Sequence, residues 1–189
     1  MKKLIPWVAL VALTAGLLAG SVSAAGANTR TAASRAFPTR AAIAKTVAFS
    51  SKYTGKASLL IDNGKVTISS ITGSGNNSLF GSSKVAGSGA ASASAECDPF
   101  GGKGSIIGGS NKISFTVTES SAQQGCANGE SGPVTVTFHG VAVATGGSGK
   151  ASGASGSLKF SGTLKLGGTS GSQDGSFKVT LSGHLAVKG

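Results

Sequence analysis

FKVTLSGHLAV, residues 177–187, alternates apolar with polar side chains at almost every step. Phe177, Val179 and Leu181 share one face of an extended chain, and Lys178 and Thr180 share the other. A period of two is typical of a strand with one buried and one solvated face. The stretch therefore predicts a β-strand with an apolar core on one side.

The same period recurs along the chain from Lys45 onward, and no window shows the i, i+3, i+4 apolar stripe of a helix. The further predicted strands cover residues 46–53, 56–61, 65–71, parts of 79–93, 104–107, 112–118, 133–145 and 158–166. Asp62, Asn63 and Gly64 supply hairpin-turn chemistry between two of them. About eight short strands predict an all-β fold, an eight-stranded antiparallel barrel or, alternatively, a two-sheet β-sandwich.

On three predicted strands a glycine lies two residues after a large apolar residue, and therefore on the same face. The pairs are Phe138 with Gly140, Phe160 with Gly162 and Leu181 with Gly183. A glycine inside a strand marks a bulge or a sharp bend such as a barrel corner, often beneath a neighbouring ring, so the pairs favour the barrel. The apolar phase also changes between Val136 and Val141, which predicts a bulge at Gly140.

These glycines admit a second interpretation, in which they leave room for a ligand inside the barrel. The polar side chains that could take part are those of Tyr53, His139 and His184. Each histidine alternates in phase with Ser or Thr, so parity places both on the polar outer face. In this second interpretation the candidate pocket residues are Tyr53, His139, His184, Gly140, Gly162 and Gly183.

The N-terminus has the pattern of an export signal. Lys2 and Lys3 precede an apolar run that ends at Leu18, and small residues then lead to a cleavage site after Ala24. The sequence predicts a signal peptide over residues 1–24, a secreted, extracellular protein and no membrane span after cleavage. Residues 25–44 are poor in large apolar side chains and predict a flexible linker rather than a short helix. Residues 45–189 remain as one all-β domain.

Cys97 and Cys126 are the two cysteines of the chain, and in an exported protein an even count predicts one disulfide. It would close a loop around the strand predicted at residues 112–118. A metal site is disfavoured because no CxxC spacing exists and the histidines lie on separate strands. Four acids lie near the cysteines without a calcium-loop spacing, and we interpret them as solvated loop charges. They are Glu96, Asp98, Glu119 and Glu130.

The chain is basic, with 17 Lys and Arg against 6 Asp and Glu. All arginines precede residue 41, and every later cation is a lysine, which suits a soluble surface better than phosphate recognition. Net positive charge favours encounters with an anionic cell-envelope polymer. After the predicted cleavage site the chain has one tyrosine, Tyr53, and no tryptophan on which bases could stack. The sequence therefore disfavours specific nucleic-acid binding.

Motifs of catalysis and cofactor binding are missing from the sequence, which contains no GxSxG, no HExxH and no GxxxxGK[ST]. His139 and His184 are the candidate bases near neutral pH, and parity places both outside the predicted core. We therefore predict no catalytic residue, no cofactor and no metal, and favour a protein that is not an enzyme.

GGSGKASGASG, residues 146–156, and the strand that follows to Leu166 resemble the GGTGxFxGAxG segment of the dirigent and allene-oxide-cyclase-like barrels and of related uncharacterised secreted bacterial proteins. The resemblance implies an eight-stranded antiparallel barrel. This chain has Ala151 where the family has an aromatic side chain that plugs the barrel. The acidic and arginine active-site residues of the plant families lie outside the matched segment, so the resemblance implies the architecture and not the chemistry.

Two functional hypotheses follow. The first is a secreted, non-enzymatic β-domain that binds a partner at the cell surface or in the medium. The second is a carrier of a small apolar ligand, or a cyclase- or isomerase-like barrel enzyme, with a pocket in the barrel. The second hypothesis predicts a cavity of hundreds of cubic ångströms inside the barrel, and a solid core would exclude it.

Overall fold

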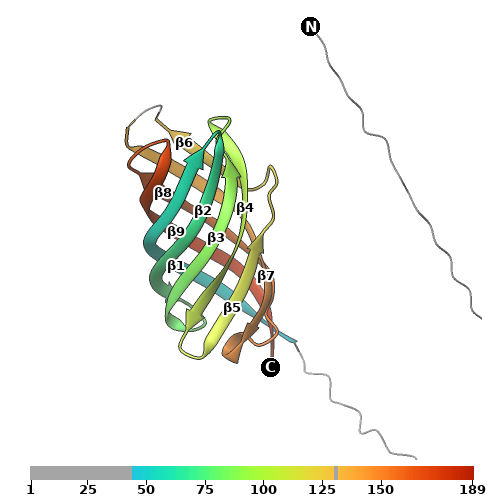
Figure 1. Ribbon diagram of the computed structural model, residues 1–189. Coiled ribbons are helices and arrows are strands. Elements are labelled where there is room, and N and C mark those ends of the chain that lie inside the picture. Colours follow the sequence, from blue (N-terminus) through green and yellow to red (C-terminus); the bar gives the residue numbers. More distant parts are fainter. Residues whose placement is uncertain (1–43, 130–131) are drawn as a thin grey trace, which may run out of the picture. The chain divides into compact units, whose positions relative to one another are not determined.

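A computed structural model describes residues 44–129 and 132–189 of the chain. The predicted signal peptide, residues 1–24, and the predicted linker up to residue 43 lie outside these described residues. Ala44, the last residue assigned to the linker, is the first residue of strand β1. The predicted strand content is confirmed, because almost all described residues belong to β-strands (Figure 1).

The first hairpin joins β1 (Ala44–Asp62) to β2 (Lys65–Asn77). Asn63 and Gly64 form its two-residue turn, with φ angles of 49° and 71°, which is the conformation that this sequence favours. The strands predicted at 46–53 and 56–61 are one strand. Gly55 lies within this strand and does not interrupt it. A Cβ at this position would collide with the carbonyl oxygen of Thr72 on β2, so the close approach of the two strands requires a glycine.

The remaining elements are β3 (Gly81–Ser92), β4 (Cys97–Gly108), β5 (Asn111–Val117), β6 (Gln124–Asn128), β7 (Val134–Ser148), the short 3₁₀ helix η1 (Gly149–Ala151), β8 (Ser155–Leu166) and β9 (Gly171–Lys188). All pairings between these strands are antiparallel. The order β3-β2-β1-β9-β8-β7-β5-β4 closes on itself because β3 also pairs with β4. The fold is therefore a closed eight-stranded antiparallel barrel and not a two-sheet sandwich.

The described residues contribute nine strands to eight positions, because β5 and β6 share the position between β4 and β7. β5 pairs with residues 102–108 of β4 and 143–148 of β7. β6 pairs with residues 97–99 of β4 and 135–139 of β7. One wall of the barrel is thus built from two short strands that follow each other along the barrel axis.

The barrel has two unlike ends. We call the mouth the end at which the β1–β2 turn, the β3–β4 loop and the β8–β9 turn lie, and the closed end the opposite one, where β1 begins and β9 ends. Figure 1 shows β6 toward the first end and the C-terminus at the second. η1 lies at the closed end, and its Ala151 is completely buried in the core together with Ala154.

The closed half of the barrel is filled by large side chains. The largest fully buried ones are Tyr53, Phe49, Ile106, Ile113, Leu158 and Leu185. All six lie on inward-facing positions of strands that alternate as predicted, with lysine, serine and threonine on the outer face. This packed layer bounds the other half of the barrel interior from below.

The bulge predicted at Gly140 is wrong. β7 pairs with β8 without a register shift from Val134 to Ala144. Small residues occupy the inward positions beyond Gly140, and Val143 faces outward with 47% of its surface exposed. Small inward residues are required because the ring of Phe160 already occupies the space over Gly140. The bulge lies farther along β7, where the pairing with β5 shifts between Ser114 and Phe115.

Candidate functional site

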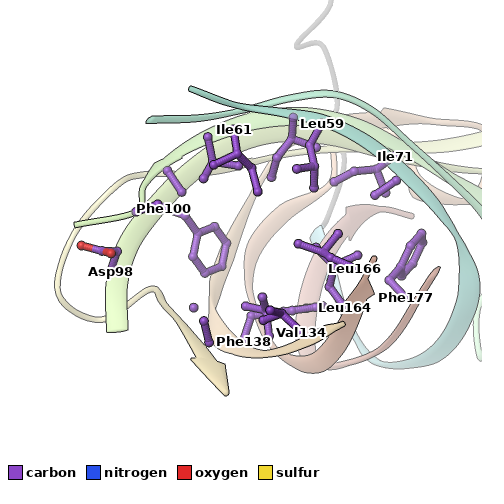
Figure 2. Close-up of a pocket in the computed structure, with 18 of the residues that line it drawn as sticks. Leu59, Ile61, Ile71, Asp98, Phe100, Val134, Phe138, Leu164, Leu166 and Phe177 are labelled. Atoms are coloured by element: carbon purple, nitrogen blue, oxygen red, sulfur yellow. The ribbon is translucent and has the colours of Figure 1, made fainter. Parts of the chain in front are cut away.

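A cavity of about 320 Å³ opens at the mouth of the barrel. It lies above the packed layer of the closed half and is lined by the mouth-side parts of the strands. Leu59 and Ile61 of β1 lie across the cavity from Val134 of β7 and Leu164 of β8 (Figure 2). We call this cavity the cup.

Aromatic rings form much of the cup wall. Five phenylalanines of the described part of the chain line it, namely Phe100, Phe115, Phe138, Phe160 and Phe177. The rings of Phe100, Phe138 and Phe160 come from three different strands, and their centroids lie 5.9–6.4 Å apart in tilted or edge-on pairs. Such pairs are a favourable packing for aromatic rings. The cup therefore has a preformed apolar wall.

Polar side chains are confined to the rim of the cup. Among the described lining residues they are Ser92, Glu96, Asp98 and Thr169, which belong to or adjoin the β3–β4 loop and the β8–β9 turn. Figure 2 shows the carboxylate of Asp98 at the edge of the cavity, turned away from the apolar side chains. Deeper in the cup, the lining residues that the structure describes offer a ligand no hydrogen-bonding side chain.

The interpretation of the acids as solvated loop charges is wrong for Asp98, which lies in β4 and is buried, with both of its carboxylate oxygens occupied. Oδ2 accepts hydrogen bonds from the backbone N–H groups of Ser94 (2.8 Å) and Ala95 (2.9 Å), and Oδ1 accepts one from the hydroxyl of Ser94 (2.8 Å). The bond from Ala95 is the main reason why the pKa of Asp98 lies below its ordinary value, against the opposing effect of burial. The role of Asp98 in this arrangement is to hold the β3–β4 loop at the rim.

The predicted disulfide between Cys97 and Cys126 is confirmed. The two cysteines face each other in the pairing of β4 with β6, beside the rim. Asp98, which follows Cys97, lines the cup, and so does Gly125, which precedes Cys126. The disulfide thus joins the loop that Asp98 holds to the short strand that completes the wall.

None of the six candidate pocket residues lines the cup. His139 and His184 are exposed on the outer faces of β7 and β9, as parity predicted. Tyr53 is buried in the closed half, where its hydroxyl lies 2.9 Å from Oγ of Ser83 and accepts a hydrogen bond of 3.2 Å from the side-chain amide of Asn77. This buried polar group stabilises the β2–β3 connection rather than a ligand site.

The three candidate glycines lie beneath other side chains. A Cβ on Gly140 would lie 2.7 Å from Cζ of Phe160, and one on Gly162 would lie 2.6 Å from Cζ of Phe138. A Cβ on Gly183 would lie 3.1 Å from a methyl group of Leu158. The rings of adjacent strands therefore cover Gly140 and Gly162, the arrangement predicted for barrel glycines.

The residues that do line the cup were not predicted from the sequence to be pocket residues. Phe177, Val179 and Leu181 were correctly predicted to face inward, but alternation does not reveal whether the space that they face is filled. Phe100 was missed because the segment around it, residues 97–105, is rich in glycine and shows no apolar alternation. The usable signal is the local excess of inward-facing glycine and alanine, which leaves a volume unfilled.

No group of three histidine, cysteine or acidic residues that could hold a metal ion occurs in the described ranges. The one helix there, η1, is too short to cross a membrane.

The fold and the site together define the class of protein: a closed eight-stranded antiparallel β-barrel, packed solid in one half and hollowed into an apolar cup in the other. Comparison of the chain with protein-family models, with curated proteins and with solved structures finds no match.

Proposed function

We propose that the protein is an exported, non-enzymatic carrier that binds a small apolar molecule in the cup. The observation that carries the proposal is a cavity of about 320 Å³ with an almost wholly apolar lining. This volume lies within the range of ligand pockets, which is about 300–1,000 Å³. Apolar surface moved from water into such a cavity contributes about 25 cal/mol per Å². The cup supports a carrier over a surface-binding domain, because binding at an outer face requires no cavity.

A cyclase- or isomerase-like enzyme would need a proton donor or acceptor within hydrogen-bond reach of the ligand. The ionisable side chains of the described lining are Glu96 and Asp98, both at the rim. Asp98 already accepts hydrogen bonds from its own loop through both oxygens. The arrangement is therefore better suited to binding than to acid–base chemistry.

The proposal is tested by titrating the purified protein with N-phenyl-1-naphthylamine, an uncharged dye that becomes fluorescent in apolar surroundings. We expect saturable binding of one dye per chain. Val66 of β2 lines the cup near the mouth, so Val66→Trp places an indole in the entrance and should abolish binding. Val143→Trp adds the same side chain on the outer face and should leave binding unchanged.

Thermal unfolding of each variant checks that it is folded. If Val66→Trp does not fold, Ile61→Trp provides a second way to block the cup. Absence of saturable dye binding to the wild type contradicts the proposal. Equal binding by the wild type and a folded, cup-blocked variant contradicts it as well, because the dye would then bind elsewhere.

A further inference from the structure

A second cavity, of about 110 Å³, lies beside the cup. We call it the side chamber. It shares six lining residues with the cup: Ile68, Ile71, Val85, Phe100, Phe115 and Val117. The two cavities are therefore immediate neighbours, and these six residues line both of them.

The side chamber exists because its outer wall is bare backbone. Gly87 and Gly89 of β3 pair with Gly104 and Gly102 of β4, and alternation from the buried Val85 turns all four glycines inward. A Cβ on Gly87 would lie 2.8 Å from the carbonyl oxygen of Lys103. The two strands thus approach too closely for side chains here, and the wall remains flat.

Of the two inward-facing glycines of β4, Gly104 is covered by a neighbouring side chain and Gly102 is not. Phe115 of β5 pairs with Gly104, and its ring lies over that glycine, with Cζ 2.6 Å from the position of a Cβ. Val117, two residues farther along β5, pairs with Gly102 in the same way. The valine side chain is too short to cover its glycine, and the uncovered space is the side chamber.

The volumes indicate the size of a ligand. A cavity of about 150 Å³ lined by Leu, Ile and Phe holds one benzene. The cup has about twice this volume, which corresponds to two rings, and the side chamber has less than the volume of one ring. A matching ligand therefore has a two-ring body and a substituent of a few carbons.

We infer that the cup and the side chamber together bind a compact, uncharged two-ring hydrocarbon that carries a short branched substituent, with the rings in the cup and the branch against the glycine wall. This inference rests on the proposed function and specifies its ligand class. A charged or hydrogen-bonding group on the buried part of the ligand would lose its hydration without gaining a partner, so the buried part is hydrocarbon.

The test displaces the bound dye with naphthalene and with 2-isopropylnaphthalene. We expect the isopropyl compound to bind more tightly. The decisive variant is Val117→Phe, which should place a ring over Gly102 as Phe115 does over Gly104 and so fill the side chamber. It should lower the affinity for 2-isopropylnaphthalene at least tenfold more than the affinity for naphthalene, because the branch loses its site.

Val143→Phe adds the same ring on the outer face and should change neither affinity. Val117→Leu fills the chamber partially and replaces the decisive variant if the latter does not fold. Unchanged preference for the branched ligand in a folded Val117→Phe variant overturns the inference, and so does equal affinity of the wild type for the two ligands. In both cases saturable dye binding leaves the proposed function standing, whereas absence of dye binding overturns the two together.

Discussion

The carboxylate of Asp98 accepts three hydrogen bonds from Ser94 and Ala95 and thereby ties the β3–β4 loop to the first residues of β4. These bonds, that from Ala95 above all, favour the charged form and lower the pKa of the carboxyl in the folded protein. An unfolded chain has the ordinary aspartate pKa of about 3.9 and therefore binds a proton at a higher pH than the folded chain does. The stability that Asp98 contributes is complete above that pH and disappears as the pH falls through the lower, folded-state pKa.

Asp98→Asn should accordingly destabilise the protein at pH 6 and make little difference at a pH below the folded-state pKa of the carboxyl. Urea unfolding of the wild type and the variant at both pH values measures the gap in unfolding free energy. Ser94→Ala removes the side-chain donor alone and should show a smaller gap with the same dependence on pH. A gap of constant size from pH 6 down to pH 2 would show that the charge of Asp98 is not what holds the loop.

Gly162 is a position at which a single methyl group should be costly. A Cβ there would lie 2.6 Å from Cζ of Phe138 and still closer to the carbonyl oxygen of Lys178. We expect Gly162→Ala to lower the unfolding free energy by about 1–3 kcal/mol, as overpacking does. In Gly167→Ala the new Cβ would lie 3.6 Å from its nearest neighbour, an atom of the Gln173 side chain. We therefore expect the unfolding free energy to change by no more than about 0.5 kcal/mol. Urea midpoints at equal m-values compare the two variants, and equal midpoints would contradict the prediction.

At the scale of the elements, the shared position of β5 and β6 is the weakest part of the wall. β6 has five residues, and its pairing with β4 extends over residues 97–99 only. The Cys97–Cys126 disulfide joins these two strands across a sequence separation of 29 residues. The covalent bond compensates for the short hydrogen-bonded ladder and keeps β6 in the wall of the cup.

Replacing both cysteines by alanine should therefore have a local and a global effect. In the chain-entropy description a loop of this length contributes about 3 kcal/mol, and the unfolding free energy should fall by that order. Hydrogen exchange should accelerate first in residues 124–128, while the β1–β9 ladder stays protected. Uniform acceleration across all strands would indicate instead that β6 is no weaker than the rest of the barrel.

The sequence predicted most of the elements because alternation is a local property. β8, β9 and the turn at Asn63-Gly64 carry their own signals and are found as predicted. β6 was missed because QGCAN has no alternation, so its strand conformation depends on β4 and β7. The predicted bulge at Gly140 failed for a related reason: parity was assigned from residue size, and here the valines face outward because a ring from β8 occupies the interior.

The cup was less predictable than the fold. Leu158 and Phe177 have the same inward-facing, apolar character, yet the first is packed solid in the core and the second borders a void. The difference depends on the summed volume of the side chains around the barrel at each level. At the level of the side chamber that sum is lowered by Gly87, Gly89 and Gly102, which come together only through the pairing of β3 with β4.

At the scale of the whole molecule, the first and last strands of the barrel are neighbours in the sheet. β1 and β9 pair over their full length, from Ala44 with Lys188 to Ile61 with Gly171. The sheet can close only after most of the chain has been synthesised, and topologies dominated by such long-range pairs fold slowly, in about milliseconds to seconds.

The predicted export signal makes the N-terminus of the processed protein a testable property. Expression of the full chain in a bacterial host should yield an extracytoplasmic protein that begins at Ala25, as determined by intact-mass spectrometry. Ala24→Leu places a large residue directly before the cleavage site and should prevent processing there. Recovery of the full-length mass from the wild type, or processing of the variant at the same bond, would contradict the predicted signal peptide.

The pairing of Ala44 with Lys188 has a practical consequence. Both ends of the barrel domain lie at the closed end, opposite the entrance of the cup. A fluorescent protein fused to either end, or a sensor chip coupled through Gly189, would attach behind the cup and leave its entrance unobstructed. The barrel can therefore serve as the recognition element of a biosensor that is attached through either terminus. Substitution of Val117 would change its ligand preference without a change in the attachment.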